Sequence, residues 1–166
     1  MISKLWIVAL LGFLGACASP PKVYNPENSP EDKLASVSTE DIGAWLNGGE
    51  LFSEFVKVWD DEGNEIATST FMKLLPDKLI LKSGKYQLLV KCATTNGMSY
   101  GVYSYGRVYP SLESGSEHVV YCLSRSEKNT FGISMIKELV VFISLLENYE
   151  EERAANVALL AIKQPD

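Results

Sequence analysis

Alternation of apolar and polar side chains is clearest in the middle of the chain, where it predicts β-strands. Within residues 85–92, every second side chain from Tyr86 to Cys92 is apolar, and the positions between them are mostly lysine or glutamine. Successive side chains of a strand point to opposite faces, so this segment has one buried face that carries Cys92. Residues 117–123 predict another strand, which contains Cys122.

Turn signals separate several further strands. The segment 60–64 contains Asp, Asn and Gly, which favour a turn, and the apolar runs on either side of it predict a hairpin. Upstream, residues 38–41 offer a helix start, and a short helix or turn is expected to end at residues 47–49. The other predicted strands are residues 34–38, 55–59, 65–70 and 78–81, and a strand or pair of strands within 98–109.

The last third of the chain fits either strand or helix. Residues 138–146 are β-branched and apolar on both faces, although the same residues also have helical spacing. Residues 147–155 are acidic and favour a helix, and residues 156–162 suit a last strand or a helix end. We expect two strands here, joined by an acidic turn or short helix.

Residues 56–92 resemble the prealbumin-like and PEGA-like modules of exported β-sandwich proteins. The likeness lies in a strand at residues 79–82 that reaches a Gly turn, after which Tyr86 opens the next strand. It implies a sandwich fold and no particular activity. Short strands with a turn about every 8–12 residues also predict a sandwich. We therefore expect a mainly β fold, a disulfide-linked antiparallel β-sandwich of prealbumin-like or immunoglobulin-like type with one or two short helices.

The start of the chain has the parts of an export signal. Lys4 supplies a positive charge, an apolar run follows it, and small residues precede Cys17. The run is shorter than the roughly 20 residues that a spanning helix needs. The motif Leu-Gly-Ala-Cys at residues 14–17 resembles the lipobox of bacterial lipoproteins. An ordinary secretory signal, in which Cys17 is a bystander, is the alternative.

The lipobox resemblance implies a cleaved and lipidated protein. Cys17 would take a diacylglycerol and become the first mature residue, with a further acyl chain such as palmitate on its amino group. Several acyl chains anchor a protein lastingly. Ala18 follows the cysteine, which in enterobacterial lipoproteins implies the outer membrane. The expected organisation is a signal peptide (1–16), a lipidated cysteine with a proline-rich tether (17–32) and one β-sandwich domain (33–166).

Composition narrows the classes of partner. The formal net charge is −6, with 21 Asp and Glu against 15 Lys and Arg. Nucleic-acid phosphates demand a basic face, so this balance argues against nucleic acid as a partner. It also argues against electrostatic adhesion to anionic lipid.

With Cys17 on lipid, two cysteines remain, Cys92 and Cys122. Export places them in an oxidising compartment, so we expect a disulfide. It would close a loop of about 30 residues and contribute roughly 3–4 kcal/mol. Two free buried thiols are the alternative. A metal site is disfavoured because the chain has no Cys-x-x-Cys and only one histidine, His118. We expect no cofactor.

The sequence gives little support to catalysis. His118 falls within a predicted strand, where an ordinary strand residue is expected. The oxygen-rich turn at residues 60–65 does not match a calcium-binding loop. The acidic run at residues 147–152 could offer paired carboxylates to a glycosidase, but a solvated face is the better interpretation. We therefore expect a protein that is not an enzyme.

A tyrosine-rich segment is the strongest candidate for binding. In an extended strand, Tyr103, Tyr105, Arg107 and Tyr109 point to the same side. Aromatic residues and arginine are enriched at binding hot spots, and the apolar face of tyrosine can stack on sugar rings. Packing of these side chains on neighbouring strands is the alternative.

The sequence thus predicts a membrane-anchored lipoprotein of the bacterial outer membrane, at its periplasmic face or at the cell surface, that acts as a non-enzymatic binding or scaffold module. Its expected partners are the membrane, through lipid on Cys17, and another envelope protein or a glycan. The alternatives are a small-ligand carrier with a cavity inside the sandwich and an envelope glycan hydrolase.

Overall fold

The structure is a computed structural model that describes residues 30–40, 50–95, 101–132 and 134–162. The predicted leader, Cys17 and the helical segment expected before residue 50 therefore lie outside the described residues. The elements in chain order are η1 (Glu31–Lys33), β1 (Leu34–Thr39), β2 (Glu50–Trp59), β3 (Glu65–Thr68), β4 (Lys78–Lys82), β5 (Gly84–Lys85), β6 (Gln87–Thr95), β7 (Tyr103–Val108), β8 (Ser111–Leu112), β9 (Glu117–Lys128), β10 (Ser134–Leu145), η3 (Leu146–Asn148) and α1 (Tyr149–Ile162).

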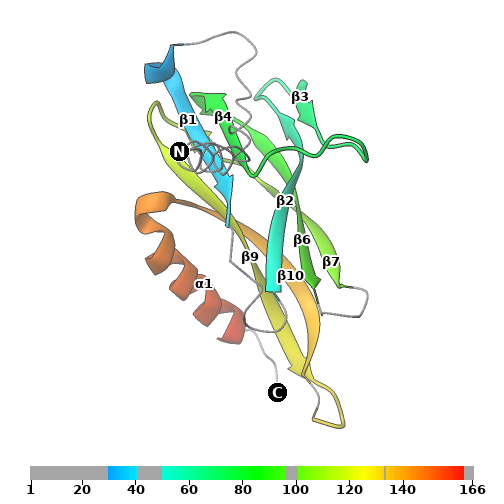
Figure 1. The fold of residues 1–166 in the computed structure, drawn as a ribbon. Coiled ribbons are helices and arrows are strands. Elements are labelled where there is room, and N and C mark those ends of the chain that lie inside the picture. The colour runs from blue at the N-terminus through cyan, green and yellow to red at the C-terminus, as the bar shows by residue number, and fades with distance from the viewer. Residues whose placement is uncertain (1–29, 41–49, 96–100, 133, 163–166) are drawn as a thin grey trace, which may run out of the picture.

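Two four-stranded sheets contain most of these strands (Figure 1). The first has the order β10-β9-β1-β4 and is called the β9 sheet below; the second has the order β3-β2-β6-β7 and is called the β6 sheet. A short ribbon of β5 and β8 stands beside them. The predicted mainly β fold with antiparallel sheets is confirmed, and so is the hairpin of β2 and β3 around the acidic turn.

One pair of strands departs from the antiparallel expectation. β1 and β9 run parallel, with Ser36 opposite Glu117 and Thr39 opposite Val120. Parallel neighbours need a long connection between them. Here that connection is the whole β6 sheet together with β4, since the chain builds both before it returns as β9.

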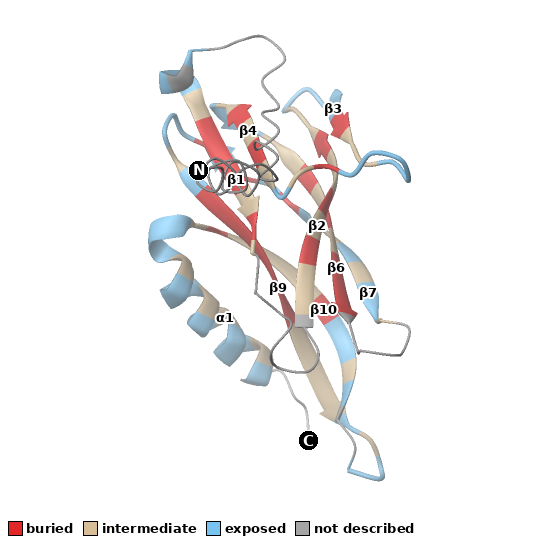
Figure 2. Cartoon of the chain, viewed as in Figure 1, coloured by how far each residue is buried: buried red, intermediate tan, exposed pale blue. Residues whose placement is uncertain are grey.

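The core lies between the two sheets and draws on both. Val37 and Leu79 from the β9 sheet and Val58 and Leu88 from the β6 sheet are fully buried in one apolar cluster. Figure 2 shows the buried residues running along β1, β9 and β6, while the β2–β3 turn and the described residues just after β9 are mostly exposed. The alternation predicted for residues 85–92 is confirmed, because Leu88, Val90 and Cys92 are buried.

A disulfide joins the two sheets beside the main core. Cys92 in β6 and Cys122 in β9 are bonded, with their Cα atoms 5.8 Å apart, and each is almost completely buried. The predicted pairing of these two cysteines is confirmed. Leu139 is buried beside them, and Leu51 and Val141 pack against the same small cluster.

The edge strands β7 and β10 approach each other closely on one side of the molecule. A Cβ atom placed on Gly106 of β7 would lie 2.1 Å from Cγ1 and 3.1 Å from Cβ of Val141 in β10. Real Cβ atoms do not come so near another carbon, so a residue without a side chain is required here.

The described part of the chain ends in a helix, which corrects the prediction of a final strand. The strand expected at residues 138–146 is confirmed by β10, but residues 156–162 continue α1 instead of forming a strand. Alanine and leucine dominate this segment and favour a helix, and Glu150 to Glu152 stabilise its start through the helix dipole. α1 packs on the outer side of the β9 sheet, against β9 and β10 (Figure 1).

The approach of β7 to β10 predicts the effect of a one-carbon substitution. Gly106→Ala should lower the free energy of unfolding by about 1–3 kcal/mol, because the new methyl group overlaps Val141. Chemical denaturation of the oxidised protein measures it. Val141→Ala in the same chain should recover part of this loss. Equal stability of Gly106→Ala and the unmodified protein would contradict the described approach of the two strands.

Candidate functional site

The outward face of the β6 sheet carries the predicted binding residues. Tyr103, Tyr105 and Tyr109 are 62%, 55% and 68% exposed, and Arg107 is exposed beside them. Tyr103, Tyr105 and Arg107 belong to β7, and Tyr109 follows directly after it. Because β7 is the edge strand of its sheet, these side chains border an unpaired strand edge.

The strand register continues this face across the sheet. Tyr105 lies opposite Lys91 of β6, and Lys91 lies opposite Glu54 of β2. Lys91 Nζ and Glu54 Oε2 are 2.9 Å apart and form an ion pair. We call this surface the tyrosine face; its residues are Phe52, Glu54, Lys57, Trp59, Lys91, Tyr103, Tyr105, Arg107 and Tyr109.

Aromatic rings and cations alternate on the tyrosine face. The rings of Tyr103 and Tyr105 meet edge to face, with centroids 5.9 Å apart. The guanidinium carbon of Arg107 lies 5.6 Å from the ring centroid of Trp59, and Lys57 Nζ lies 5.8 Å from the same ring. Cation–π contacts of this kind hold the long basic side chains in place over the sheet.

The residue types of the tyrosine face suit binding of a partner more than catalysis. Tyrosine offers a large rigid ring with a polar tip, so it gives contact area at low conformational cost. Its ring faces can stack on a sugar or on an apolar side chain, and Arg107 can pair with a carboxylate or phosphate. The alternative considered from the sequence was packing of the tyrosines on neighbouring strands. The ring contact of Tyr103 and Tyr105 lies within β7 itself, and each of these residues keeps more than half of its surface in water.

The single histidine is part of a strand and is mostly covered. His118 is 9% exposed, and its Nδ1 atom lies 3.5 Å from the hydroxyl of Ser116. Burial lowers the pKa of His118, and the opposing effect of Glu113 is smaller, so the neutral imidazole is favoured. Its position is that of the ordinary strand residue expected from the sequence.

Both acidic segments lie on open surface. Asp60 accepts hydrogen bonds from the backbone and side-chain nitrogens of Asn64, at 2.7 and 3.0 Å, which close the β2–β3 turn. The hydrogen bond from the Asn64 side chain is the main reason why the pKa of Asp60 is lowered. Glu150 to Glu152 are exposed in the first turn of α1. Within the described ranges, no group of three or more His, Cys, Asp and Glu residues could hold a metal ion.

A serine motif of the sequence was not among the predicted candidate residues. Residues 97–101 are Gly-Met-Ser-Tyr-Gly and match the Gly-x-Ser-x-Gly motif of hydrolases. That motif places its serine on a sharp turn from a strand into a helix. Here the described strands on either side of the segment, β6 and β7, are antiparallel neighbours. Residues 96–100 lie outside the described residues.

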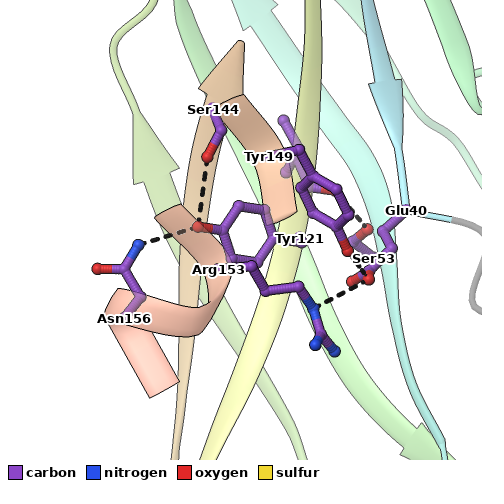
Figure 3. A network of polar contacts seen from close by, with 8 residues as sticks. Glu40, Ser53, Tyr121, Ser144, Tyr149, Arg153 and Asn156 are labelled. Carbon is purple, nitrogen blue, oxygen red and sulfur yellow. Dashed lines mark hydrogen bonds and ion pairs between the residues drawn. The ribbon is translucent and has the colours of Figure 1, made fainter. Parts of the chain in front are cut away.

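A buried polar cluster beneath α1 is a second feature that the sequence did not reveal (Figure 3). The Tyr121 side chain is completely buried, and its hydroxyl accepts hydrogen bonds from Asn156 Nδ2 at 2.9 Å and from Ser144 Oγ at 3.3 Å. The Tyr121 ring stacks on Phe142 and meets Tyr149 edge to face. One helix face thus satisfies a strand hydroxyl that would be costly to bury alone.

Glu40 completes this cluster from the end of β1. Its Oε1 atom accepts a hydrogen bond from the Tyr149 hydroxyl and lies 3.2 Å from Arg153 Nε. Its Oε2 atom is buried and has no hydrogen-bond partner among the described residues. Burial raises the pKa of Glu40, Arg153 opposes that rise, and Glu150 adds to it. The contacts dock α1 on the β9 sheet, so we assign the cluster a structural role.

A regular spacing could have indicated the cluster. Tyr149, Arg153 and Asn156 are spaced i, i+4 and i+7, which places them on one helix face. That signal needs α1 to extend through residue 156, whereas the sequence favoured a strand from that position onward. Glu40 offered no local signal, because its partners lie more than 100 residues further along the chain.

The comparisons with known proteins gave no relative. No protein-family model, curated protein or solved structure matches this chain. None of the helices in the described part of the chain is long and apolar enough to cross a membrane.

The Glu40–Arg153 ion pair predicts a pH-dependent loss of stability. Arg153→Met should lower the free energy of unfolding by about 1–2 kcal/mol near neutral pH, because a half-buried carboxylate loses its counter-charge. The loss should shrink in the acidic range. The pKa of Glu40 is higher in the folded protein than in the unfolded chain. The stabilisation that comes from this difference is fully present below the unfolded-state pKa. It is lost as the pH rises through the folded-state pKa.

Denaturation curves at several pH values measure this effect, and Glu40→Gln is the matched control. Arg153→Met in the Glu40→Gln chain should remove less stability at neutral pH, and that smaller loss should not vary with pH in the acidic range. An Arg153→Met loss that is constant from acidic to neutral pH in the otherwise unmodified chain would contradict the pairing of the two side chains.

Proposed function

We propose that the protein is a membrane-anchored envelope lipoprotein that acts as a non-enzymatic binding or scaffold module through the tyrosine face. In this proposal, lipid on Cys17 holds the chain at the outer membrane, and residues 17–32 are the tether that displays the folded domain. The two facing sheets would be a prealbumin-like or immunoglobulin-like β-sandwich. The partner is another envelope protein or a glycan.

The observation that carries the proposal is the exposure of three tyrosines, two on the edge strand β7 and one directly after it. A folded domain normally covers large aromatic side chains, yet Tyr103, Tyr105 and Tyr109 each keep more than half of their surface in water. They stand beside Arg107, and tyrosine with arginine is the composition of interface hot spots. The ion pair of Lys91 and Glu54 adds a polar border of the kind found around such patches.

The positions of the carboxylates support binding over hydrolysis. A glycosidase needs two carboxyl groups that face each other across a sugar, one of them with a raised pKa. The acidic residues considered for that role, at the start of α1, are exposed, and so are Asp61, Glu62 and Glu65 of the β2–β3 turn. Glu40 does have a raised pKa, but its contacts to Tyr149 and Arg153 commit it to docking the helix.

The interior gives less support to the carrier alternative. A ligand between the sheets would have to displace side chains such as Leu79, Leu88 and Val120, which are fully buried against one another. Protein interiors are close-packed, so such displacement is costly. The outer surface of the β6 sheet requires no rearrangement of this kind.

Photo-crosslinking in the native envelope tests the proposal. The full chain would carry p-benzoylphenylalanine in place of Tyr105 in one variant and of Glu151 in the control, which is exposed on α1 over the other sheet. We expect a recurrent protein or glycan adduct from position 105 and none from position 151. Digestion with protease or muramidase distinguishes the two kinds of partner.

A second arm tests the face itself. Tyr103→Ala and Tyr109→Ala should each weaken capture from position 105 by roughly tenfold, which corresponds to the 1–2 kcal/mol of a moderate hot spot. Lys137→Ala, an exposed change on β10, should have no effect. The same adducts from positions 105 and 151, or no recurrent adduct from position 105, would refute binding through the tyrosine face.

A further inference from the structure

The connection between β3 and β4 contains a tight turn, which presents two large apolar side chains to solvent. Phe71 is fully exposed and Met72 is 92% exposed. Thr70 and Lys73 close the turn with two backbone hydrogen bonds, Thr70 N to Lys73 O at 2.9 Å and Lys73 N to Thr70 O at 3.1 Å. We call Phe71 and Met72 the apolar tip.

The body of the protein holds this turn at both of its ends. Before it, Ser69 N donates a hydrogen bond to Val56 O of β2 at 2.7 Å. After it, Leu75 is buried in the core. The backbone contacts and Leu75 therefore fix the turn without any contribution from burial of Phe71 or Met72.

The residue types at the tip run against ordinary turn chemistry. Two-residue turns favour Gly, Asn, Asp, Ser and Pro, which tolerate the backbone and prefer water. Phenylalanine and methionine offer neither advantage here, and Leu74, just beyond the turn, is also 63% exposed. A local conflict of this kind in an otherwise consistent sequence points to a function for the side chains.

The size of the tip decides between a protein and a membrane as its occupant. Even two large side chains of at most about 250 Å² each bury less than the roughly 800 Å² that a stable protein interface takes from each partner. A bilayer needs no shape complementarity and accepts a small apolar wedge. The apolar tip alone would bind a bilayer weakly. A lipid anchor in the same chain makes insertion of the tip intramolecular and raises the effective concentration of the tip at the membrane.

The position of the tip agrees with this choice. The described chain enters at η1, and the residues between Cys17 and Pro30 can span on the order of 40 Å. Figure 1 shows the β3–β4 connection projecting from the half of the molecule that contains η1, β1 and β4, on the side away from η1. Its far end is held at the C-terminal end of β1, where Asp77 O accepts a hydrogen bond from Thr39 N. The other exposed tip, at Phe131, lies roughly 25 Å beyond the last β9 residue that pairs with β1.

We infer that the apolar tip inserts into the lipid surface to which the chain is anchored and thereby orients the domain on the membrane. The inference rests on the proposed function, because it takes the anchor at Cys17 as given. Phe71 and Met72 enter the region of headgroups and upper acyl chains. Lys73, which is exposed next to them, stays at the level of the headgroups, where basic side chains are favourable.

Crosslinking to lipid tests the inference. The lipidated full chain, purified and reconstituted in vesicles of phosphatidylethanolamine and phosphatidylglycerol, would carry p-benzoylphenylalanine in place of Phe71 or of Phe131. Phe131 is the matched control, an exposed phenylalanine in a hairpin turn at the opposite end. We expect severalfold more phospholipid adduct from position 71 than from position 131. Equal adducts, or none from position 71, would overturn the inference.

Two further arms complete the test. In cells, a protein adduct from position 71 in place of the lipid adduct would overturn the inference in favour of a protein partner. Membrane fractionation of Cys17→Ser reports on the anchor separately. Release of that variant, together with no lipid adduct at position 71 in the anchored chain, would refute the tip and leave the anchor intact. Met72→Ser should reduce the adduct from position 71 without changing the free energy of unfolding, because Met72 packs against nothing in the core.

Discussion

The bond between Cys92 and Cys122 is the constraint on which the rest of the structure depends. It ties β6 of one sheet to β9 of the other at their buried faces, so it holds the two sheets together beside the core. Closing a loop of about 30 residues contributes roughly 3–4 kcal/mol, a large share of the stability of a domain of this size. The tight approach of Gly106 to Val141 closes the same interface at its edge.

With the inner faces packed against each other, the two outer faces differ in what covers them. The β9 sheet buries Tyr121 on its outer side and must satisfy that hydroxyl, and α1 does so with Asn156. The β6 sheet has no helix over it among the described residues, and its outer side keeps the tyrosine face in water. This asymmetry is why we place partner binding on the β6 sheet.

Strand positions could be predicted from the sequence because alternation is a local signal. The buried face of residues 85–92 followed from a spacing of two, and the cysteine pair followed from the expectation of export. Pairing across the chain was beyond such reasoning. Nothing near Leu34 or Glu117 indicates that β1 and β9 run parallel. The direction of a neighbour depends on the path that the chain takes through the other sheet.

The C-terminal segment also shows that local sequence alone does not decide the structure. Residues 156–162 suit a strand or a helix locally, and the choice depends on what the β9 sheet needs on its outer face. Tyr121 requires a polar partner there, which a helix can supply from one face. Four residues of the tyrosine face, Tyr103, Tyr105, Arg107 and Tyr109, could be predicted because they alternate along one extended segment. The cluster of Glu40, Tyr149 and Arg153 joins distant segments and gave no such signal.

A single measurement tests the central claim, which is that one cysteine carries lipid and the other two hold the sheets together. The full chain would be extracted from membranes, alkylated without reduction, digested and analysed by mass spectrometry. The account predicts a first peptide that begins at Cys17 with the added mass of a diacylglycerol, together with one linked pair of peptides that contains Cys92 and Cys122. An alkylated Cys92 or Cys122, or an unmodified Cys17 that still follows its leader, would contradict it.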